Sequence, residues 1–150
     1  MSVSVRVAGE RDTFTLVALR RSWNEEDAGG PIDDHELARR FVAWLASEGD
    51  SRTFFIVEVD GEPVGMANVK RYVRMPAAGR DDAGHWGYVG NVYVHAAHRD
   101  AGVGRVLMDA LVAWSREHRY ERLRLAPTER ARPFYTRLGF VPGQVIQLNP

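Results

Sequence analysis

The stretch "VYVHAAHRDAGVGRVLMDAL" (92–111) joins a strand-like apolar run to an apolar pattern with helical spacing. The connection between them holds Gly102 and Gly104, flanked by Arg99 and Arg105. A helix N-terminus offers about four backbone N–H groups without partners, together with a partial positive charge. Glycine also lets a ligand approach the backbone closely. The stretch therefore fits either a site for a phosphate-like anion or a plain glycine-rich turn with surface arginines.

Two common phosphate motifs do not match this connection. A P-loop requires a lysine and then a serine or threonine after its last glycine, whereas Arg105 and Val106 stand there. The dinucleotide fingerprint requires a third glycine three positions after Gly104, whereas Leu107 stands there. The flanking elements must therefore show what the connection does.

The apolar spacing along the rest of the chain predicts alternating strands and helices. Strands are expected at 4–8, 53–59, 64–70, 88–94, 122–126 and 144–148. Helices are expected from Asp12 to about Trp23, over 37–49 after a capping box of Asp33 and Glu36, over 103–114 and over 128–140. The order βααββ followed by βαβαβ predicts one α/β domain over residues 1–150, with a βαβ unit around the glycine-rich connection.

The composition limits the compartment and the chemistry. The 150 residues carry 20 basic and 20 acidic side chains, so nothing global favours a nucleic acid or a membrane as partner. The N-terminus lacks the apolar core of a signal peptide, and we expect a cytoplasmic protein. The absence of cysteine excludes disulfides, thiolate nucleophiles and cysteine-type zinc sites. Lys70 is the one lysine and ends an expected strand, which argues against Schiff-base chemistry.

Two stretches together resemble a known family. "VYVHAAHRDAGVGRVLMDAL" resembles the acetyl-coenzyme A motif of the GNAT superfamily of N-acetyltransferases, in which Arg99, Gly102 and Gly104 match the Arg/Gln-x-x-Gly-x-Gly/Ala pattern. "ARPFYTRLGFVP" (131–142) resembles the family's second motif, Ala-x-x-Phe-Tyr followed by Leu-Gly-Phe. The resemblance in element order covers nearly the whole chain. It implies an α/β fold with a mixed sheet, whose fourth and fifth strands splay apart to admit the pantetheine arm.

The resemblance also implies a co-substrate, acetyl-coenzyme A, and a set of residues that bind it. The pyrophosphate would lie on successive backbone N–H groups at about Asp100 to Arg105. The implied coenzyme-binding residues are Val92, Tyr93, Val94, Arg99, Asp100, Ala101, Gly102, Val103, Gly104, Arg105, Thr128 and Phe134.

The implied reaction is direct attack of a primary amine on the thioester. A backbone N–H of the strand at 92–94 would hold the oxyanion, and Tyr135 would protonate the departing thiolate. Tyr135 could equally pack as a core aromatic beside Phe134 and Phe140.

Three positions depart from the family pattern. Ala96 stands where proline is common, and Thr128 stands where an asparagine often touches the pantetheine arm. Asn91 replaces a frequent acidic residue, so the usual carboxylate base is missing, although an amide there could orient water or substrate.

The general base is therefore an open question. His85, Glu58 and Tyr88 are the candidates, and His85 has an unperturbed pKa of about 6.5. His85 could also be a solvated loop residue, and a free amine would need no base.

Other polar and aromatic residues admit two interpretations. Two expected loops lie where this family builds its acceptor site, and both carry acidic residues: Glu25, Glu26 and Asp27 in one, Asp81 and Asp82 in the other. These carboxylates would form an acidic rim for a cationic amine, or they would simply face solvent. Trp23 and Trp86 would line the same cleft or pack in the core. His95 and His98 lie in a turn without a third ligand of suitable spacing, so we expect no metal.

The acceptor is expected to be a small-molecule or peptide amine, and the resemblance suggests a homodimer. Two alternatives stay open: a non-catalytic acyl-coenzyme A binding or sensing module, and an N-acyltransferase that uses a longer acyl chain.

Overall fold

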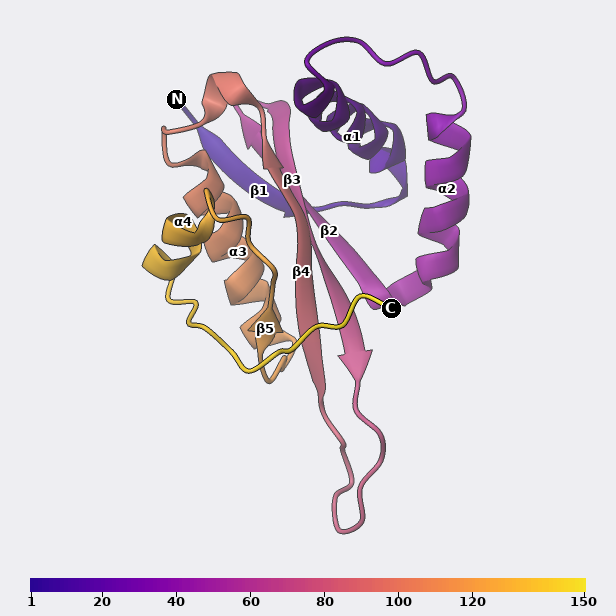
Figure 1. Ribbon diagram of the computed structural model, residues 1–150, viewed down its shortest axis with the longest axis vertical. Helices are drawn as coiled ribbons and strands as arrows, with labels where there is room; N and C mark the ends of the chain where they lie inside the picture. Colours follow the sequence, from indigo (N-terminus) through magenta and orange to yellow (C-terminus); the bar gives the residue numbers. More distant parts are fainter.

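The computed structural model describes residues 1–150 as one sheet with helices on both faces (Figure 1). The strands are β1 (Val3–Val7), β2 (Arg52–Val59), β3 (Glu62–Val73), β4 (His85–Val94) and β5 (Leu123–Arg124). The helices are α1 (Thr13–Ala28), α2 (Leu37–Glu48), α3 (Val103–Glu117) and α4 (Arg132–Arg137). The strand order is β1-β2-β3-β4-β5, antiparallel throughout except for the parallel pair β4 and β5. The expected mixed α/β sheet is confirmed.

Each face of the sheet carries its own apolar core, because side chains alternate between the faces along each strand. On one face, α3 packs its buried stripe of Val103, Leu107, Met108 and Leu111 against the sheet. On the other face, α1 and α2 cover Phe54, Ile56, Met66 and Tyr93. Figure 1 shows α3 and α4 on one side of the sheet and α1 and α2 on the other.

Strand β4 leaves its neighbour β5 after a short contact. The parallel pairing consists of Gly87 opposite Leu123 and Tyr88 opposite Arg124, and it goes no further. Opposite β3, the register shifts by one extra residue on β4 between Gly90 and Tyr93. Such a β-bulge bends and twists its strand. The second half of β4 therefore has no strand on its β5 side, which is the expected splay.

The C-terminal part of the chain differs from the sequence-based prediction. The strand expected at 144–148 does not form, because no neighbouring strand pairs with this segment. Its apolar side chains face solvent, and Ile146 is 95% exposed. Strand β5 and helix α4 are also shorter than expected.

The start of α2 corrects the predicted capping box. The carboxylate of Asp34, not that of Asp33, accepts the backbone N–H of Glu36 at 2.9 Å. Asp33 instead contacts His35 at 2.9 Å, and Glu36 pairs with Arg39. None of the helices is both long and apolar enough to span a bilayer.

Candidate active site

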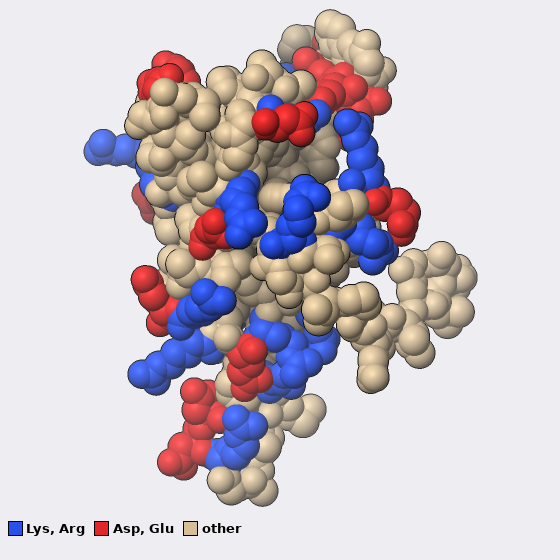
Figure 2. Space-filling view, turned by 90° about the vertical axis from the view of Figure 1, so that its left-hand side faces the viewer, with Lys and Arg blue, Asp and Glu red and all other residues tan.

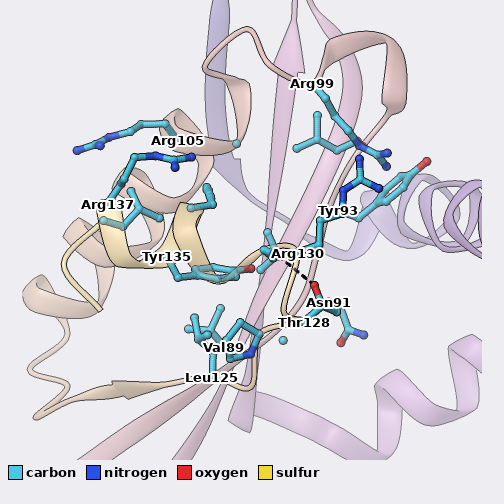
Figure 3. Close-up of a pocket in the computed structure, with 18 of the residues that line it drawn as sticks. Val89, Asn91, Tyr93, Arg99, Arg105, Leu125, Thr128, Arg130, Tyr135 and Arg137 are labelled. Carbon is cyan, nitrogen blue, oxygen red and sulfur yellow. Dashed lines mark hydrogen bonds between the residues drawn. The ribbon is translucent and has the colours of Figure 1, made fainter. Parts of the chain in front are cut away.

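A groove of about 710 Å³ lies where β4 and β5 separate. Its walls are the second half of β4, the segment after β5, the N-terminus of α3 and one side of α4, and Trp23 of α1 closes one end. Of the predicted coenzyme-binding residues, ten line this groove: Val92, Tyr93, Val94, Arg99, Asp100, Gly102, Gly104, Arg105, Thr128 and Phe134. Tyr135 and Asn91 line it as well, so residues predicted from two separate motifs lie around one space (Figure 3).

The loop before α3 leaves a row of backbone donors free. The backbone N–H groups of residues 100–105 form no hydrogen bond within the chain, and the first such bond in this helix runs from Val106 to the carbonyl of Gly102 at 3.1 Å. Asp100 and Gly102 have φ values of 59° and 82°, in the left-handed region. Alternation of left-handed and ordinary residues turns successive N–H groups toward one point and creates an anion-binding concavity. The geometry is therefore that of a phosphate cradle at a helix N-terminus.

Gly104 keeps the groove open at this cradle. A Cβ added there would lie 3.5 Å from Cζ of Phe134, which is an ordinary contact distance. The helix itself would thus accept a side chain at this position. The missing side chain matters for the space that a ligand would occupy, not for the fold.

Two predicted coenzyme-binding residues lie apart from this surface. The side chain of Val103 is 1% exposed and belongs to the core, so its backbone N–H alone faces the cradle. Ala101 is exposed and does not line the groove. The motif could not predict that these two side chains lie away from the groove, because it does not specify the direction of each side chain.

Four arginines and a single carboxylate, Asp100, line the groove. Arg105 makes one long contact, 3.4 Å to Asp109 one turn further along α3. Arg130 and Arg137 line the groove without any ion pair, and the sequence analysis did not identify them. Arg130 directly precedes the second family motif and Arg137 lies within it, at a position that the motif pattern leaves unspecified. Figure 2 shows basic side chains around a hollow on the face that carries α3 and α4.

Arg99, the fourth arginine, is committed to other contacts. Its two terminal nitrogens donate to the carboxylate of Glu26 at 2.6 Å each, and its Nε donates to the carbonyl of Val94 at 2.8 Å. Its guanidinium also lies 5.7 Å from the ring centroid of Tyr93. Hydrogen bonds from Arg99 lower the pKa of Glu26 below its ordinary value of 4.5. The arginine therefore ties α1 to the loop before α3.

Tyr135 extends from α4 into the groove with its hydroxyl directed away from the helix (Figure 3). Phe134 and Phe140 flank its ring, at centroid distances of 5.1 and 5.8 Å. Burial raises the pKa of the phenol above its ordinary value of 10.0. The hydroxyl has no hydrogen-bond partner in the chain, so it is a neutral donor that is free for a ligand.

Thr128 positions the helix that carries Tyr135. Its Oγ1 accepts the backbone N–H of Ala131 at 3.2 Å, and its carbonyl accepts the N–H groups of Ala131 and Arg132 at 3.1 Å. The hydroxyl thereby caps the turn before α4, which is the usual role of a threonine at such a place.

The three candidate bases lie outside the groove. Nε2 of His85 is 2.9 Å from the carbonyl of His118, at the far end of β4, and its ring packs on Tyr120. Glu58 pairs with Arg6 of the edge strand β1 at 2.8 Å. Tyr88 lies on the sheet surface before the splay. The hypothesis that one of them takes the proton of the amine loses its geometric basis.

The predicted acidic rim is wrong, because its two halves lie at opposite ends of the molecule. Glu25 and Glu26 end α1 and pair with Arg21 and Arg99. The loop that holds Asp81 and Asp82 forms the far tip of the β3–β4 hairpin (Figure 1).

The structure places the two tryptophans predicted to line the cleft, and it shows the contacts of His95. Trp23 lines the groove and stacks on Tyr93 at 5.6 Å, whereas Trp86 stacks on Tyr72 at 4.7 Å outside it. Nδ1 of His95 contacts the Tyr93 hydroxyl at 3.1 Å, and desolvation lowers the pKa of this imidazole.

Comparison with known proteins agrees with this arrangement. The family model described as the acetyltransferase (GNAT) family matches residues 16–140. A curated Bacillus subtilis (strain 168) protein, named provisionally as an acetyltransferase, is 25% identical over 135 residues, which are 90% of this chain and 80% of that protein.

Two solved structures share the fold over nearly the full length. A GCN5-related N-acetyltransferase from Ralstonia eutropha JMP134 is 26% identical, with a TM-score of 0.74 and 99% of each chain covered. A Clostridium acetobutylicum protein, described as a predicted acetyltransferase with acetyl-CoA, is 24% identical, with a TM-score of 0.72 and coverage of 99% of this chain and 96% of that chain.

A splayed mixed sheet with a phosphate cradle at the split defines an acyltransferase fold. Because the family model matches most of the sequence, the chain belongs to the acetyltransferase (GNAT) family.

Proposed function

We propose that this protein, as one domain over its 150 residues, transfers the acetyl group of acetyl-coenzyme A to a primary amine. The observation that carries the proposal is the row of free backbone N–H groups at residues 100–105, at one end of a groove that holds Tyr135. The pyrophosphate would lie on this row, and the pantetheine arm would pass between β4 and β5. The structural neighbour from Clostridium acetobutylicum was solved with acetyl-CoA, which supports this choice of co-substrate.

The proposed reaction is a direct transfer. The amine nitrogen attacks the thioester carbon, and a backbone N–H of residues 92–94 stabilises the oxyanion that forms. As the carbonyl is restored, the carbon–sulfur bond breaks and the phenol of Tyr135 donates its proton to the thiolate. Burial raises the pKa of this phenol, so it remains protonated at neutral pH and above.

No imidazole lines the groove, and its one carboxylate, Asp100, belongs to the cradle. We therefore propose that the acceptor reacts as the free amine and passes its proton to solvent. The rate should then rise with pH toward the pKa of the acceptor amine.

The exposed C-terminal segment supports a homodimer. Val141, Val145, Ile146 and Leu148 are all more than two-thirds exposed, and a groove of about 950 Å³ separates this segment from β5. Contiguous exposed apolar side chains are typical of surfaces that contact another protein. We propose that a second copy covers them.

Thiol release with a panel of amines, together with calorimetric titration of acetyl-coenzyme A, tests the enzymatic proposal. We expect coenzyme binding and amine-dependent release of free thiol. Saturable binding without thiol release on any amine would instead indicate a sensing module. Faster thiol release with longer acyl-coenzyme A substrates would show that the transferred group is a longer acyl chain and not acetyl.

A further inference from the structure

We infer that Asn91 selects the acceptor: it presents an amide N–H to the substrate, and the acceptor is an amine that also bears a carboxylate. The inference rests on the proposed function and names the substrate class of the same site. It comes from a chain of three side chains, Arg52, Asn68 and Asn91, in which each hydrogen bond fixes the direction of the next.

Arg52 sets the direction at the start of this chain. A guanidinium has donors and no acceptor, so any partner must accept from it. Its Nε donates to Glu48 at 2.6 Å, and its Nη1 donates to Oδ1 of Asn68 at 2.6 Å. The oxygen of the Asn68 amide must therefore face Arg52.

Asn68 fixes the orientation of Asn91 in turn, because its amide oxygen and amide nitrogen lie on opposite sides of the group. The residue is 0% exposed, so both of its polar atoms require partners within the protein. With Oδ1 facing Arg52, Nδ2 faces Asn91 and donates to its Oδ1 at 2.8 Å. The oxygen and nitrogen of an amide have nearly the same shape, but the guanidinium leaves one assignment that satisfies all three groups.

Asn91 is the end of the chain and borders the groove. Its Oδ1 is occupied by Asn68, so its Nδ2 is left to donate. That nitrogen has no partner in the protein, and no buried side-chain nitrogen or oxygen lacks one, so Nδ2 is open to solvent. The β4 bulge and a left-handed φ of 54° set the backbone of Asn91 in this position. Asn91 lines the groove, and its amide is a fixed donor at the border of that space, at the position where the family often carries an acidic residue.

The surrounding charge favours an anion beside this donor. Glu48 is shared by two cations, Arg52 at 2.5 Å and Lys70 at 2.9 Å, which leaves one positive charge in excess behind Asn91. In the groove itself Arg99 is neutralised by Glu26, and Arg105, Arg130 and Arg137 still outnumber the one lining carboxylate, Asp100. An ammonium group would meet a donor and a positive field at this point. A carboxylate would meet a complementary charge and a hydrogen-bond donor.

The test compares acceptors in matched pairs. Each pair consists of an amino acid and of the amine that remains when its carboxylate is removed. In the unaltered protein, kcat/KM from thiol release should be about 10-fold to 100-fold higher for the amino acid, the range for one hydrogen bond to a charged group. Equal rates, or faster turnover of the bare amine, would overturn the inference and leave the proposed function intact. No thiol release from any amine would overturn both.

Asn91→Asp should remove or reverse this preference. The new carboxylate still accepts from Asn68, tolerates the left-handed backbone and turns an acceptor oxygen toward the groove. Asn149→Asp makes the same chemical change in the C-terminal segment and should leave the ratio between acceptors unchanged. An unaltered ratio in Asn91→Asp would overturn the inference.

Asn68→Asp separates positioning from contact with substrate. A carboxylate at residue 68 accepts from Arg52 and cannot donate, so the Asn91 amide turns and presents its oxygen to the groove. The preference for the carboxylate-bearing acceptor should fall, while the dissociation constant for acetyl-coenzyme A stays within about twofold. If this buried substitution prevents folding, Asn91→Asp alone decides.

Discussion

Arg99 clasps Glu26 with two hydrogen bonds of 2.6 Å, across 73 residues of sequence. The pair links the end of α1 to the loop that presents the free N–H groups at residues 100–105. It thereby holds the proposed phosphate cradle against Trp23 and Tyr93, which close the groove.

Glu26→Gln tests this link through its pH dependence. Arg99 lowers the pKa of Glu26 from 4.5, so the pair stabilises the folded state above that pH. The stabilisation is lost as the pH falls below 4.5 and through the lowered folded-state pKa. We expect a lower Tm for the variant at pH 7 and a smaller difference from the unaltered protein at pH 3. A difference in Tm that persists unchanged at low pH would assign the effect to packing.

Gly104→Ala should impair coenzyme binding in a protein that still folds. The new methyl group would make an ordinary contact with Phe134, and alanine favours a helix over glycine by about 1 kcal/mol, so the Tm should hold or rise. The Kd for acetyl-coenzyme A should increase about tenfold or more, because the methyl group fills ligand space. Gly143→Ala, in open space on the C-terminal segment, serves as the control. Unchanged affinity in a folded Gly104→Ala protein would remove the pyrophosphate assignment.

Arg137→Gln should weaken binding of the phosphate-bearing part of the coenzyme. The guanidinium lines the groove and has no ion-pair partner, so it is free for an anion. We expect a rise of about 3-fold to 30-fold in the Kd of coenzyme A at low salt and less at high salt. The Kd of pantetheine, which lacks the phosphates, should not change. Arg116→Gln, at the other end of α3, should alter neither value.

Tyr135→Phe should separate chemistry from binding. The substitution keeps the ring between Phe134 and Phe140 and deletes only the hydroxyl, so Tm and coenzyme Kd should survive. We expect kcat to fall by about 10²–10⁴-fold, with the lower end favoured because a thiolate is a fair leaving group. Tyr72→Phe, outside the groove, provides the matched control.

The pH profile adds a second measure of Tyr135. Burial raises the pKa of its phenol above the ordinary value, so the protonated acid should be lost at a higher pH than for an exposed tyrosine. The alkaline limb of kcat should therefore be absent in Tyr135→Phe. A variant within about twofold of the unaltered kcat would show that Tyr135 is a packing residue.

Ile146→Asp tests the homodimer. The side chain is 95% exposed, so a monomer should tolerate the substitution with little change in Tm. If a second copy covers Ile146, a buried carboxylate without a partner should dissociate the dimer. Light scattering after size exclusion should then show twice the chain mass for the unaltered protein and the single mass for the variant. Val73→Asp, exposed at the end of β3, should leave the mass unchanged. A monomeric unaltered protein would refute the proposal.

Local sequence determined much of this protein. The apolar spacing that begins at Val103 specifies the buried face of α3, and it depends on neighbours only three and four residues apart. Gly102 and Gly104 mark the loop whose N–H groups remain free, because their effect acts through their own backbone. The match of Tyr135 to a family motif likewise predicts that it lies in the same groove as this loop, and it does.

The pairing of strands in the tertiary structure decided where several side chains lie, which their spacing along the chain does not show. His85 and Asn91 lie six residues apart in one strand, yet the register of β4 sends one toward His118 and the other into the groove. The segment at 144–148 has the β-branched and apolar residues typical of a strand but no strand to pair with, and an unpaired strand gains no ladder of hydrogen bonds.

The donor at Asn91 depends on tertiary structure in the same way. Its direction comes from Arg52 through Asn68, three residues on three strands. Their side chains meet only after β2, β3 and β4 have paired in register, and a buried amide takes its orientation from those neighbours alone.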